Sequence, residues 1–358
     1  VSLFALSPNL RPSVELLADV LRNPAFAPAE VERLRNQQLV SIENELTQPG
    51  GLAARTLPPI LFGAAHPYGR PSSGTGDAAV VSKLGRADLV AFQQAWLRPD
   101  KATIFIVSDR PLAEGRSVLD ASLGGWKGEG APGAKSFPAA LPQPQSRIVL
   151  VDRPDSPQSL IYGGQVTPLK GSDELLPYIA ANDVLGGNFL SRLNMDIRES
   201  KGWSYGVSGN FRRLLQRVPY MVSAPVQADR TGDALAAMQQ DIAQFLTSQG
   251  ITPEEKERTI LGFVRELPGS FETGSDVLGG MQNNVLYGRP DDYYDTIASR
   301  YRALTAPEMD KAIRSVIDPS KFIWVVVGDA KAVKPQLDRL RLPVEVKTVP
   351  QRTAQGEK

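Results

Sequence analysis

The sequence predicts an α+β fold made of two duplicated domains, each a mainly antiparallel sheet with helices packed on one of its faces. Three observations lead to this prediction. Two stretches of the chain resemble each other at a spacing of about 225 residues. In the second stretch, strand-like apolar runs gather at the start, helical patterns follow, and one more strand-like run returns near the end. A segment rich in Gly and Pro separates the two stretches, as is typical of an interdomain linker.

The internal repeat is weak but keeps its register. FAPAEVE around Pro28 matches ITPEEKE around Pro253, and LFG ending at Gly63 matches LYG ending at Gly288, both at a spacing of 225. PDK with the apolar run TIFIVSD aligns with PSK and FIWVVVGD at a spacing of 220. The first copy therefore holds about five extra residues, which we place in the loop HPYGRPSSGTGD. A period of this length indicates a duplicated domain rather than a solenoid, because each copy is large enough to have its own core.

The first copy is predicted to be truncated at its N-terminal side. VSLFALSP at residues 1–8 corresponds to VSAPVQAD at residues 222–229, which leaves residues 146–221 without a counterpart. The first copy would therefore lack about 75 residues. We expect the chain to be a fragment or a processed product whose first strand finds its neighbours elsewhere.

The first domain is predicted over residues 1–140, ending within the linker at 127–145, and the second over residues 146–345. Periodicity and turn signals predict, for the first domain, a strand at 1–6, helices at 11–23, 28–47, 51–62 and 86–97, a strand at 102–108 and a helix at 111–122. For the second they predict strands at 147–152 and 159–166, helices near 172–185 and 190–200, strands at 204–212 and 220–228, several further helices, a strand at 322–328 and a closing helix.

The amino-acid composition argues against several classes of function. The 358 residues carry 40 Lys and Arg against 39 Asp and Glu, so no net field attracts nucleic acid or an anionic membrane surface. No apolar run approaches the ~20 residues that a membrane span needs, and no basic-then-apolar leader opens the sequence. Cysteine is absent, which excludes disulfides, thiolate nucleophiles and cysteine zinc ligands and suits an oxidising compartment.

His66 is the only histidine, and it precedes a proline between Gly63 and Gly69, in a turn rather than on a helix. A zinc site needs three or four protein ligands, so we expect a structural or surface role for this imidazole. No G-x-S-x-G elbow supports a Ser-His-Asp triad, and the glycines near Gly74 do not have the spacing of a phosphate-binding loop.

The most distinctive segment is GGNFLSRLNMDIRESKGWSYGVSGNF at residues 186–211. It opens with Gly186 and Gly187, which are expected to make a tight turn between two helices at backbone angles that need positive φ. The helix that follows is expected to end at Gly202, where the chain turns into the next strand.

Two side chains of this segment can carry binding chemistry. Arg198 lies near the end of the predicted helix and Tyr205 at the start of the following strand, so the turn can bring guanidinium and phenol side by side. The arginine is a permanently charged donor and the tyrosine a neutral one, and together they can hold a peptide carbonyl. In the alternative interpretation, Arg198 pairs with Glu199 or with a helix C-terminus, and Tyr205 only packs.

The segment resembles the pitrilysin/insulinase (inverzincin) zinc peptidases and their non-catalytic relatives, in which a GG-F-SRL-x-x-x-(L/I)RE-x-x-G-x-(S/A)Y pattern opens the passage from helix to strand in the second domain. NPAFAPAEVERLRNQQL, HPYGRP and LRPDKATIFIVSD also resemble stretches of that family's first domain, so the resemblance extends to about residue 340. It implies two similar α+β domains per half. It also implies that Arg198 and Tyr205 occupy the positions of the family's Arg/Tyr pair, which reaches from the non-catalytic half to the substrate backbone near the zinc.

The sequence departs from the family's catalytic pattern. Active members carry H-x-x-E-H on a helix of the first domain and a further Glu as third zinc ligand, and that first helix belongs to the segment the first copy lacks. Alignment of EVERLRNQQLVSIENEL with the third-ligand helix puts Ser41 at the ligand position and Leu34 at the supporting acidic position. Neither side chain suits zinc, so Ser41 is a degenerate metal position. An alignment shifted by two residues would offer Glu43 instead.

The resemblance therefore implies the non-catalytic half of a two-half zinc peptidase, which forms one wall of a peptide-binding chamber and contacts the substrate backbone. This chain would hold no cofactor, and zinc would be bound by a homologous partner half from the same precursor or a separate subunit. The substrate would be a peptide or an unfolded polypeptide, and the location in a bacterium periplasmic or otherwise exported. Two alternatives stay open: an active zinc metallopeptidase whose H-x-x-E-H segment is missing from this chain, and a catalytically dead scaffold like the core subunits of respiratory complexes.

Overall fold

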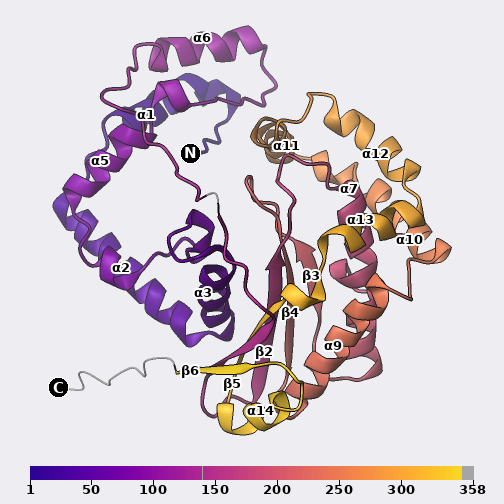
Figure 1. The fold of residues 1–358 in the computed structure, drawn as a ribbon. Helices are drawn as coiled ribbons and strands as arrows, with labels where there is room; N and C mark the ends of the chain where they lie inside the picture. The colour runs from indigo at the N-terminus through magenta and orange to yellow at the C-terminus, as the bar shows by residue number, and fades with distance from the viewer. Residues whose placement is uncertain (139, 349–358) are drawn as a thin grey trace, which may run out of the picture. The chain divides into compact units, whose positions relative to one another are not determined.

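The computed structural model describes residues 1–138 and 140–348 (Figure 1). Residue 139, which falls within the predicted linker 127–145, lies outside the described residues. The chain forms two compact units that interleave along the sequence. One unit comprises residues 1–42, 75–136 and 268–285. The other contains the sheet and comprises residues 43–74, 137–267 and the chain from Leu286 onward.

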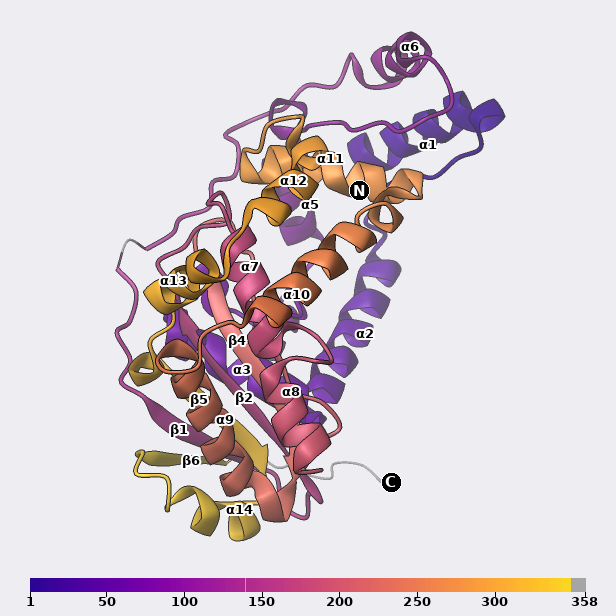
Figure 2. The same cartoon turned by 90° about the vertical axis from the view of Figure 1, so that its right-hand side faces the viewer.

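A six-stranded mixed sheet forms the centre of the second unit (Figures 1 and 2). Its strands are β1 (Arg147–Asp152), β2 (Gln158–Val166), β3 (Ser208–Phe211), β4 (Pro219–Gln227), β5 (Ile323–Gly328) and β6 (Val344–Thr348). Their order in the sheet is β3-β4-β2-β5-β1-β6. β1 runs parallel to β5 and β6, whereas the other three pairs are antiparallel. The predicted α+β class is confirmed, the strand expected at 204–212 is shorter than predicted, and β6 is an addition to the prediction.

Helices cover both faces of this sheet. As a result, β5 is buried along its whole length. Trp324 and Val326 point to the layer that contains α7 (Leu176–Asn182), α9 (Thr231–Leu246) and α13 (Ala306–Val316). Val325 and Val327 point to the opposite side, where α3 (Pro49–Phe62) packs (Figure 1). The prediction of helices on one face only is therefore wrong. A strand that is apolar on both sides of its pleat must have both sides removed from water.

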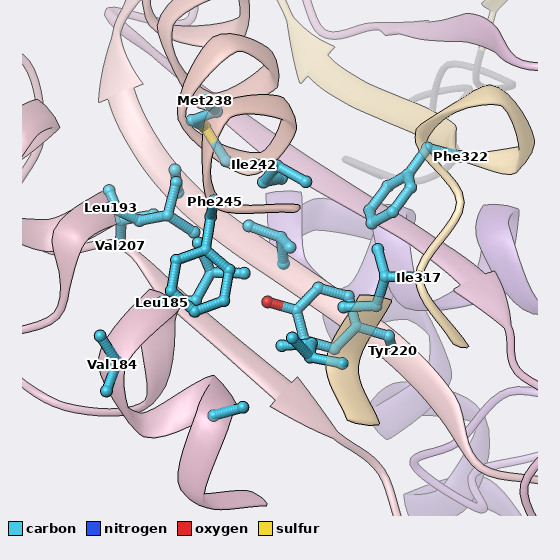
Figure 3. Packing of buried hydrophobic residues seen from close by; sticks show 14 of the residues in the cluster. Val184, Leu185, Leu193, Val207, Tyr220, Met238, Ile242, Phe245, Ile317 and Phe322 are labelled. Atoms are coloured by element: carbon cyan, nitrogen blue, oxygen red, sulfur yellow. The ribbon is translucent and has the colours of Figure 1, made fainter. Parts of the chain in front are cut away.

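The larger of the two apolar clusters lies between the sheet and α9. Figure 3 shows Met238 and Phe245 of α9 pointing toward Leu185 and Leu193, with Tyr220 of β4 beneath them. Burial raises the pKa of Tyr220. The remaining longer helices of this unit are α10 (Pro253–Glu266), α12 (Tyr293–Ala303) and α14 (Ala330–Leu337). Within the described residues, no helix combines the length and the apolar character that a membrane crossing requires.

Within the described residues, the regular elements of the first unit are all helices, and extended segments connect them. It contains α1 (Leu10–Arg22), the first part of α2 (Pro28–Thr47), α4 (Ala78–Val81), α5 (Arg86–Trp96), α6 (Leu112–Leu123) and most of α11 (Gly274–Tyr287). The strands predicted at 1–6 and 102–108 are wrong, because neither segment pairs with a neighbour in the described chain. Their composition suits a strand, but an extended segment becomes one only through ladder hydrogen bonds. Phe4 and Ile104 are 75% and 54% exposed.

The described residues hold one sheet, whereas the predicted duplication requires two. The two halves of the repeat therefore differ in what they form. Residues 222–229 and 322–328 overlap the interior strands β4 and β5, while their first-copy counterparts, residues 1–8 and 102–108, stay outside any sheet. The structure shows α+β architecture around a single sheet and does not show duplicated domains.

Substitution of Gly163 tests the packing between the central strands β2 and β5. It lies opposite Trp324 in the β2–β5 register, and a Cβ at this position would come within 2.4 Å of the indole ring. Trp324 is buried and stacks on Phe322 at a centroid distance of 5.2 Å, so the ring has little room to yield. We expect Gly163→Ala to lower the free energy of unfolding by about 1–3 kcal/mol in urea denaturation, because it overpacks the core.

Gly262→Ala is the matched control for this substitution. Gly262 lies inside α10 with open space around the position of a Cβ, so alanine there should leave stability unchanged or raise it by up to about 1 kcal/mol. If Gly163→Ala is as stable as the wild type, the close contact between β2 and Trp324 is not a constraint on this fold.

Candidate functional site

Residues 186–211 connect the end of α7 to the edge strand β3, all within the sheet-bearing unit. α7 continues into the π-helical turn Asp183–Gly187, a loop follows, and α8 (Arg192–Asn194) runs into a second π-helical turn, η5 (Met195–Ser200). After the turn at Gly202 the chain makes an isolated bridge between Ser204 and Val226 and enters β3. The predicted passage from helix to strand is confirmed.

Glycines permit this path for two different reasons. Gly202 has a φ of +66° and ends η5 in the left-handed region that favours glycine. Gly186 and Gly187 do not adopt the positive φ that the sequence predicted. A Cβ on Gly186 would lie 2.8 Å from the backbone nitrogen of Gly209, so glycine is needed there for the close approach of helix and strand.

Both predicted binding residues line one hollow of about 340 Å³, whose walls are residues 186–189 and 205–208 and whose lining includes Asn194. Tyr205 stands at its rim with 83% of its surface exposed. The Arg198 guanidinium carbon lies 4.5 Å from the centroid of the Phe189 ring, a cation–π contact. Arg198 also pairs with Glu199 at 2.9 Å, the partner named in the alternative interpretation. The structure thus brings Arg198 and Tyr205 to the same hollow and keeps the arginine ion-paired.

Asn194 is a residue of this site that the sequence analysis missed. It is 3% exposed, and its amide joins the two walls. Its Oδ1 accepts a hydrogen bond from the Val207 backbone nitrogen at 3.0 Å, and its Nδ2 donates to the Phe189 carbonyl at 2.7 Å. One feature of the sequence could have indicated Asn194. Asparagine is a poor helix former, so its presence within a helical stretch suggests that its side chain has a local hydrogen-bond partner.

Asp183 holds the loop that forms the first wall. Its Oδ2 accepts hydrogen bonds from Asn188 Nδ2 at 2.6 Å and from Thr259 Oγ1 at 2.7 Å. Asn188 in turn accepts a hydrogen bond from the Leu190 backbone nitrogen at 2.7 Å. Burial raises the pKa of Asp183, and the hydrogen bonds from Thr259 and Asn188 act in the opposite direction.

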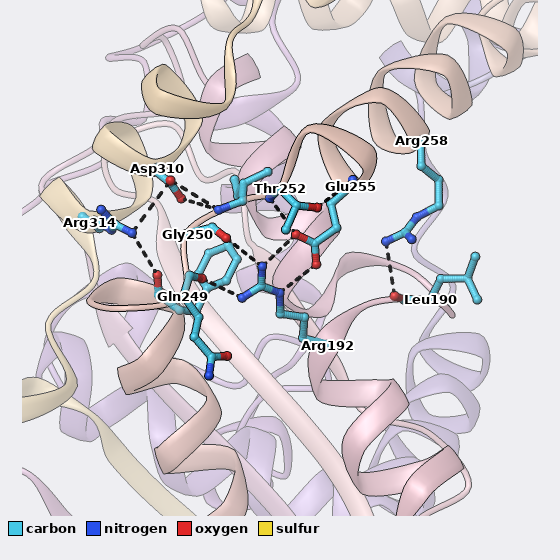
Figure 4. Close-up of polar contacts among 11 residues, drawn as sticks. Leu190, Arg192, Gln249, Gly250, Thr252, Glu255, Arg258, Asp310 and Arg314 are labelled. Atoms are coloured by element: carbon cyan, nitrogen blue, oxygen red, sulfur yellow. Dashed lines mark hydrogen bonds and ion pairs between the residues drawn. The ribbon is translucent and has the colours of Figure 1, made fainter.

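Arg192 ties the site to the loop between α9 and α10 (Figure 4). Its guanidinium binds both carboxylate oxygens of Glu255, at 2.8 and 2.7 Å, and donates to the carbonyls of Gln249 and Gly250. Glu255 also closes the capping box of α10 with Thr252. Burial alone would raise the pKa of Glu255, but the hydrogen bonds from Arg192 and Thr252 outweigh it and hold this pKa below its usual value. A bidentate arginine of this kind fixes the position of α8.

A second acidic group lies beside η5. Asp196 pairs with Lys201, and Asp241 of α9 faces Asp196. Burial raises the pKa of Asp241 to about 6, and the Asp196 carboxylate adds to the rise, while Lys201 and Arg192 oppose it. The turn η5, which carries Arg198, therefore contacts α9 at Asp241. The charge of this carboxyl group changes in mildly acidic solution.

The positions considered for metal do not form a site. Ser41 is exposed and donates its hydroxyl to the Gln37 carbonyl of its own helix at 3.0 Å, and both Leu34 and Glu43 are exposed on α2. Within residues 1–138 and 140–348, no three His, Asp or Glu side chains converge in a way that would hold a metal ion.

His66 has a structural role, as predicted. It is 3% exposed, its Nδ1 accepts a hydrogen bond from the Tyr68 backbone nitrogen at 2.9 Å, and its ring stacks on Phe62. Burial lowers its pKa, and the positive charge of Arg217 lowers it further. The imidazole thus caps a turn and fills an aromatic cluster.

Asp241 gives a pH-dependent prediction. Because its pKa in the folded protein lies above the ordinary value of 3.8, its contribution to stability is present below about pH 4 and is lost as the pH rises through about 6. The free energy of unfolding of the wild type, measured against that of Asp241→Asn, should therefore fall across this interval. The asparagine variant should be the more stable protein above pH 6. Parallel curves of unfolding free energy against pH for the two proteins would contradict the raised pKa of Asp241. Asp233→Asn, at an exposed position on the same helix, is the control for removal of a charge.

Comparison with known proteins places this geometry in a family. Residues 83–262, half of the chain, match the model of the peptidase M16 inactive domain. A crystal structure of a peptidase M16 inactive domain from Pseudomonas fluorescens superposes with a TM-score of 0.79 at 26% identity, covering 89% of this chain and 75% of that one.

Two relatives show how far the similarity extends. An uncharacterized zinc protease of Mycobacterium tuberculosis is 26% identical over 265 residues, which cover 70% of this chain and 56% of that protein. A non-peptidase homolog of Helicobacter pylori is 21% identical over 324 residues, covering 90% of this chain and 73% of that protein. The chain spans about half the length of the mycobacterial relative. It belongs to the peptidase M16 (pitrilysin/insulinase) family and corresponds to the family's inactive domain.

Proposed function

We propose that this chain is the non-catalytic half of a two-half M16 peptidase and that it binds the backbone of peptide substrates in the hollow that contains Arg198 and Tyr205. The observation that carries the proposal is that both side chains line a single hollow beside the start of the edge strand β3. The two side chains come from different elements, a π-helical turn and the approach to β3, and face the same space.

The chemistry of the pair suits a peptide backbone. The guanidinium offers several charged donors and the phenol one neutral donor, while an extended peptide presents carbonyl oxygens as acceptors. Phe189 and Tyr205 add exposed aromatic surface beside these donors. Such a site orients a substrate for a catalyst elsewhere and transfers no proton itself.

The ion pair of Arg198 with Glu199 does not prevent binding. Both side chains are partly exposed, at 33% and 40%, and ion pairs of this kind contribute only about 1 kcal/mol or less. A peptide carbonyl that enters the hollow can therefore share or replace the glutamate. The same pair supports the scaffold alternative, in which the arginine has a structural partner and binds no substrate.

Zinc is proposed to lie in a homologous partner half. Ser41 and Leu34 at the third-ligand and supporting positions support this assignment, as does the H. pylori relative, which is described as a non-peptidase homolog. The mycobacterial relatives are described as zinc proteases, and they are longer than this chain. The partner half would come from the same precursor or from a separate subunit.

We further propose that the repeat reflects two copies of one ancestral unit, divided near residue 140 into parts over 1–140 and 146–345. The helix bounds support this proposal. α2 and α10 both begin at a proline, 225 positions apart, and α3 and α11 have the same length and the same spacing. α5 and α13 repeat at a spacing of 220. An exported, periplasmic location is also a proposal, and the absence of cysteine supports it.

Peptide affinity tests the function. We expect Arg198→Ala combined with Tyr205→Phe to weaken the binding of fluorescein-labelled β-casein, an unfolded polypeptide, by about tenfold in fluorescence anisotropy, since charged and neutral hydrogen bonds are lost. Arg230→Ala removes a surface arginine that does not line the hollow and should leave affinity unchanged. Unchanged affinity of the double variant would reject the binding role and favour the scaffold.

Metal content and hydrolysis separate the proposal from an active enzyme. The purified chain should contain less than about 0.1 zinc per molecule and should not cleave the casein probe, because no suitable set of ligands is available in its described residues. Stoichiometric zinc together with cleavage that a chelator abolishes would establish the active-peptidase alternative.

A further inference from the structure

Arg198 and Tyr205 contact different walls of the hollow. Both can bind one peptide only if a contact between the walls fixes their separation. Arg198 leans on the ring of Phe189, which belongs to the loop at residues 186–189. Tyr205 belongs to the other wall, at residues 205–208. The two walls are separate stretches of backbone, and β3 does not begin until Ser208.

One buried amide spans this gap. Asn194 donates to the Phe189 carbonyl through Nδ2 at 2.7 Å and accepts from the Val207 backbone nitrogen through Oδ1 at 3.0 Å. Donor and acceptor are thus used on opposite walls, and at 3% exposure the amide has almost no water to replace either partner. Loss of the hydrogen bond from Val207 would leave a buried backbone N–H unpaired.

The connection runs from this amide to both binding side chains. On one side it passes through the Phe189 backbone to the Phe189 ring, on which the Arg198 guanidinium rests at 4.5 Å. On the other side, Val207 lies two residues after Tyr205, and the intervening Gly206 donates its backbone N–H to the Ser204 hydroxyl at 3.0 Å. The Ser204 hydroxyl donates in turn to the Pro225 carbonyl of β4 at 2.6 Å, which fixes this wall to the sheet.

We propose that Asn194 is the positioning residue of the site, which sets the separation of Arg198 and Tyr205 so that both reach one extended peptide backbone. The inference rests on the proposed function and adds the residue through which the two donors are coupled. Asn194 also lines the hollow, yet its amide is occupied by the two walls and acts on the peptide through Arg198 and Tyr205.

Two substitutions probe this role. Asn194→Asp keeps an acceptor for Val207 and removes the donor to Phe189, whereas Asn194→Ala removes both hydrogen bonds. We expect each to weaken the binding of fluorescein-labelled β-casein by roughly tenfold, the factor that corresponds to about one hydrogen bond. Gln165→Ala is the matched control, because Gln165 is a buried amide that likewise joins two backbone groups, the Val316 carbonyl and the Asp318 nitrogen, and does not line the hollow. This control should lower the urea midpoint and leave casein affinity unchanged.

A double-mutant cycle separates positioning from general stability. In the Arg198→Ala, Tyr205→Phe background, Asn194→Asp should cause no further loss of affinity, since the side chains that it positions are gone. An equal loss in both backgrounds, or wild-type affinity for both Asn194 variants, would overturn the positioning role. In either case the Arg198→Ala, Tyr205→Phe variant would still bind casein more weakly than the wild type, and the proposed function would stand. Wild-type affinity of the Arg198 and Tyr205 double variant would instead overturn the proposed function and this inference together.

Discussion

The structure of the sheet-bearing unit depends on one constraint, the burial of a strand that is apolar on both sides. β5 places Trp324 and Val326 on one face and Val325 and Val327 on the other, so neither side of this strand can meet water. The helices α7, α9 and α13 cover one face and α3 covers the other. Gly163 is part of the same constraint, because only glycine leaves room for the Trp324 ring across the β2–β5 pair.

The candidate site lies at the edge of this sheet, where regular structure ends. β3 is a short edge strand, and the segment before it must leave a helix, approach the sheet closely at Gly186 and turn at Gly202. Backbone polar groups freed by this path are satisfied by side chains such as Asn194 and Ser204. The two hydrogen bonds from Arg192 to Glu255 hold the surrounding helices together, so Arg198 and Tyr205 project from well-anchored backbone.

The sequence allowed prediction of those features whose signal is local. β1 and α2 were predicted at their observed bounds, because apolar runs and proline starts are local patterns. The segments 1–6 and 102–108 have equally good strand composition and still form no strand, since pairing is a tertiary event. β6 was missed because its short, exposed sequence VEVKT has only two apolar residues. Arg198 and Tyr205 were proposed from a motif, whereas the contacts of Asn194 could not be predicted, because they join two backbone groups 5 and 13 residues away.

The central claim is that an unfolded polypeptide occupies the hollow between residues 186–189 and 205–208. Photo-crosslinking with a peptide that carries benzoylphenylalanine, followed by mass spectrometric mapping, tests it most directly. We expect adducts to concentrate in the segment from Gly186 to Ser208 and to disappear when unlabelled casein competes. Adducts distributed over other surfaces, or labelling that casein does not displace, would contradict it.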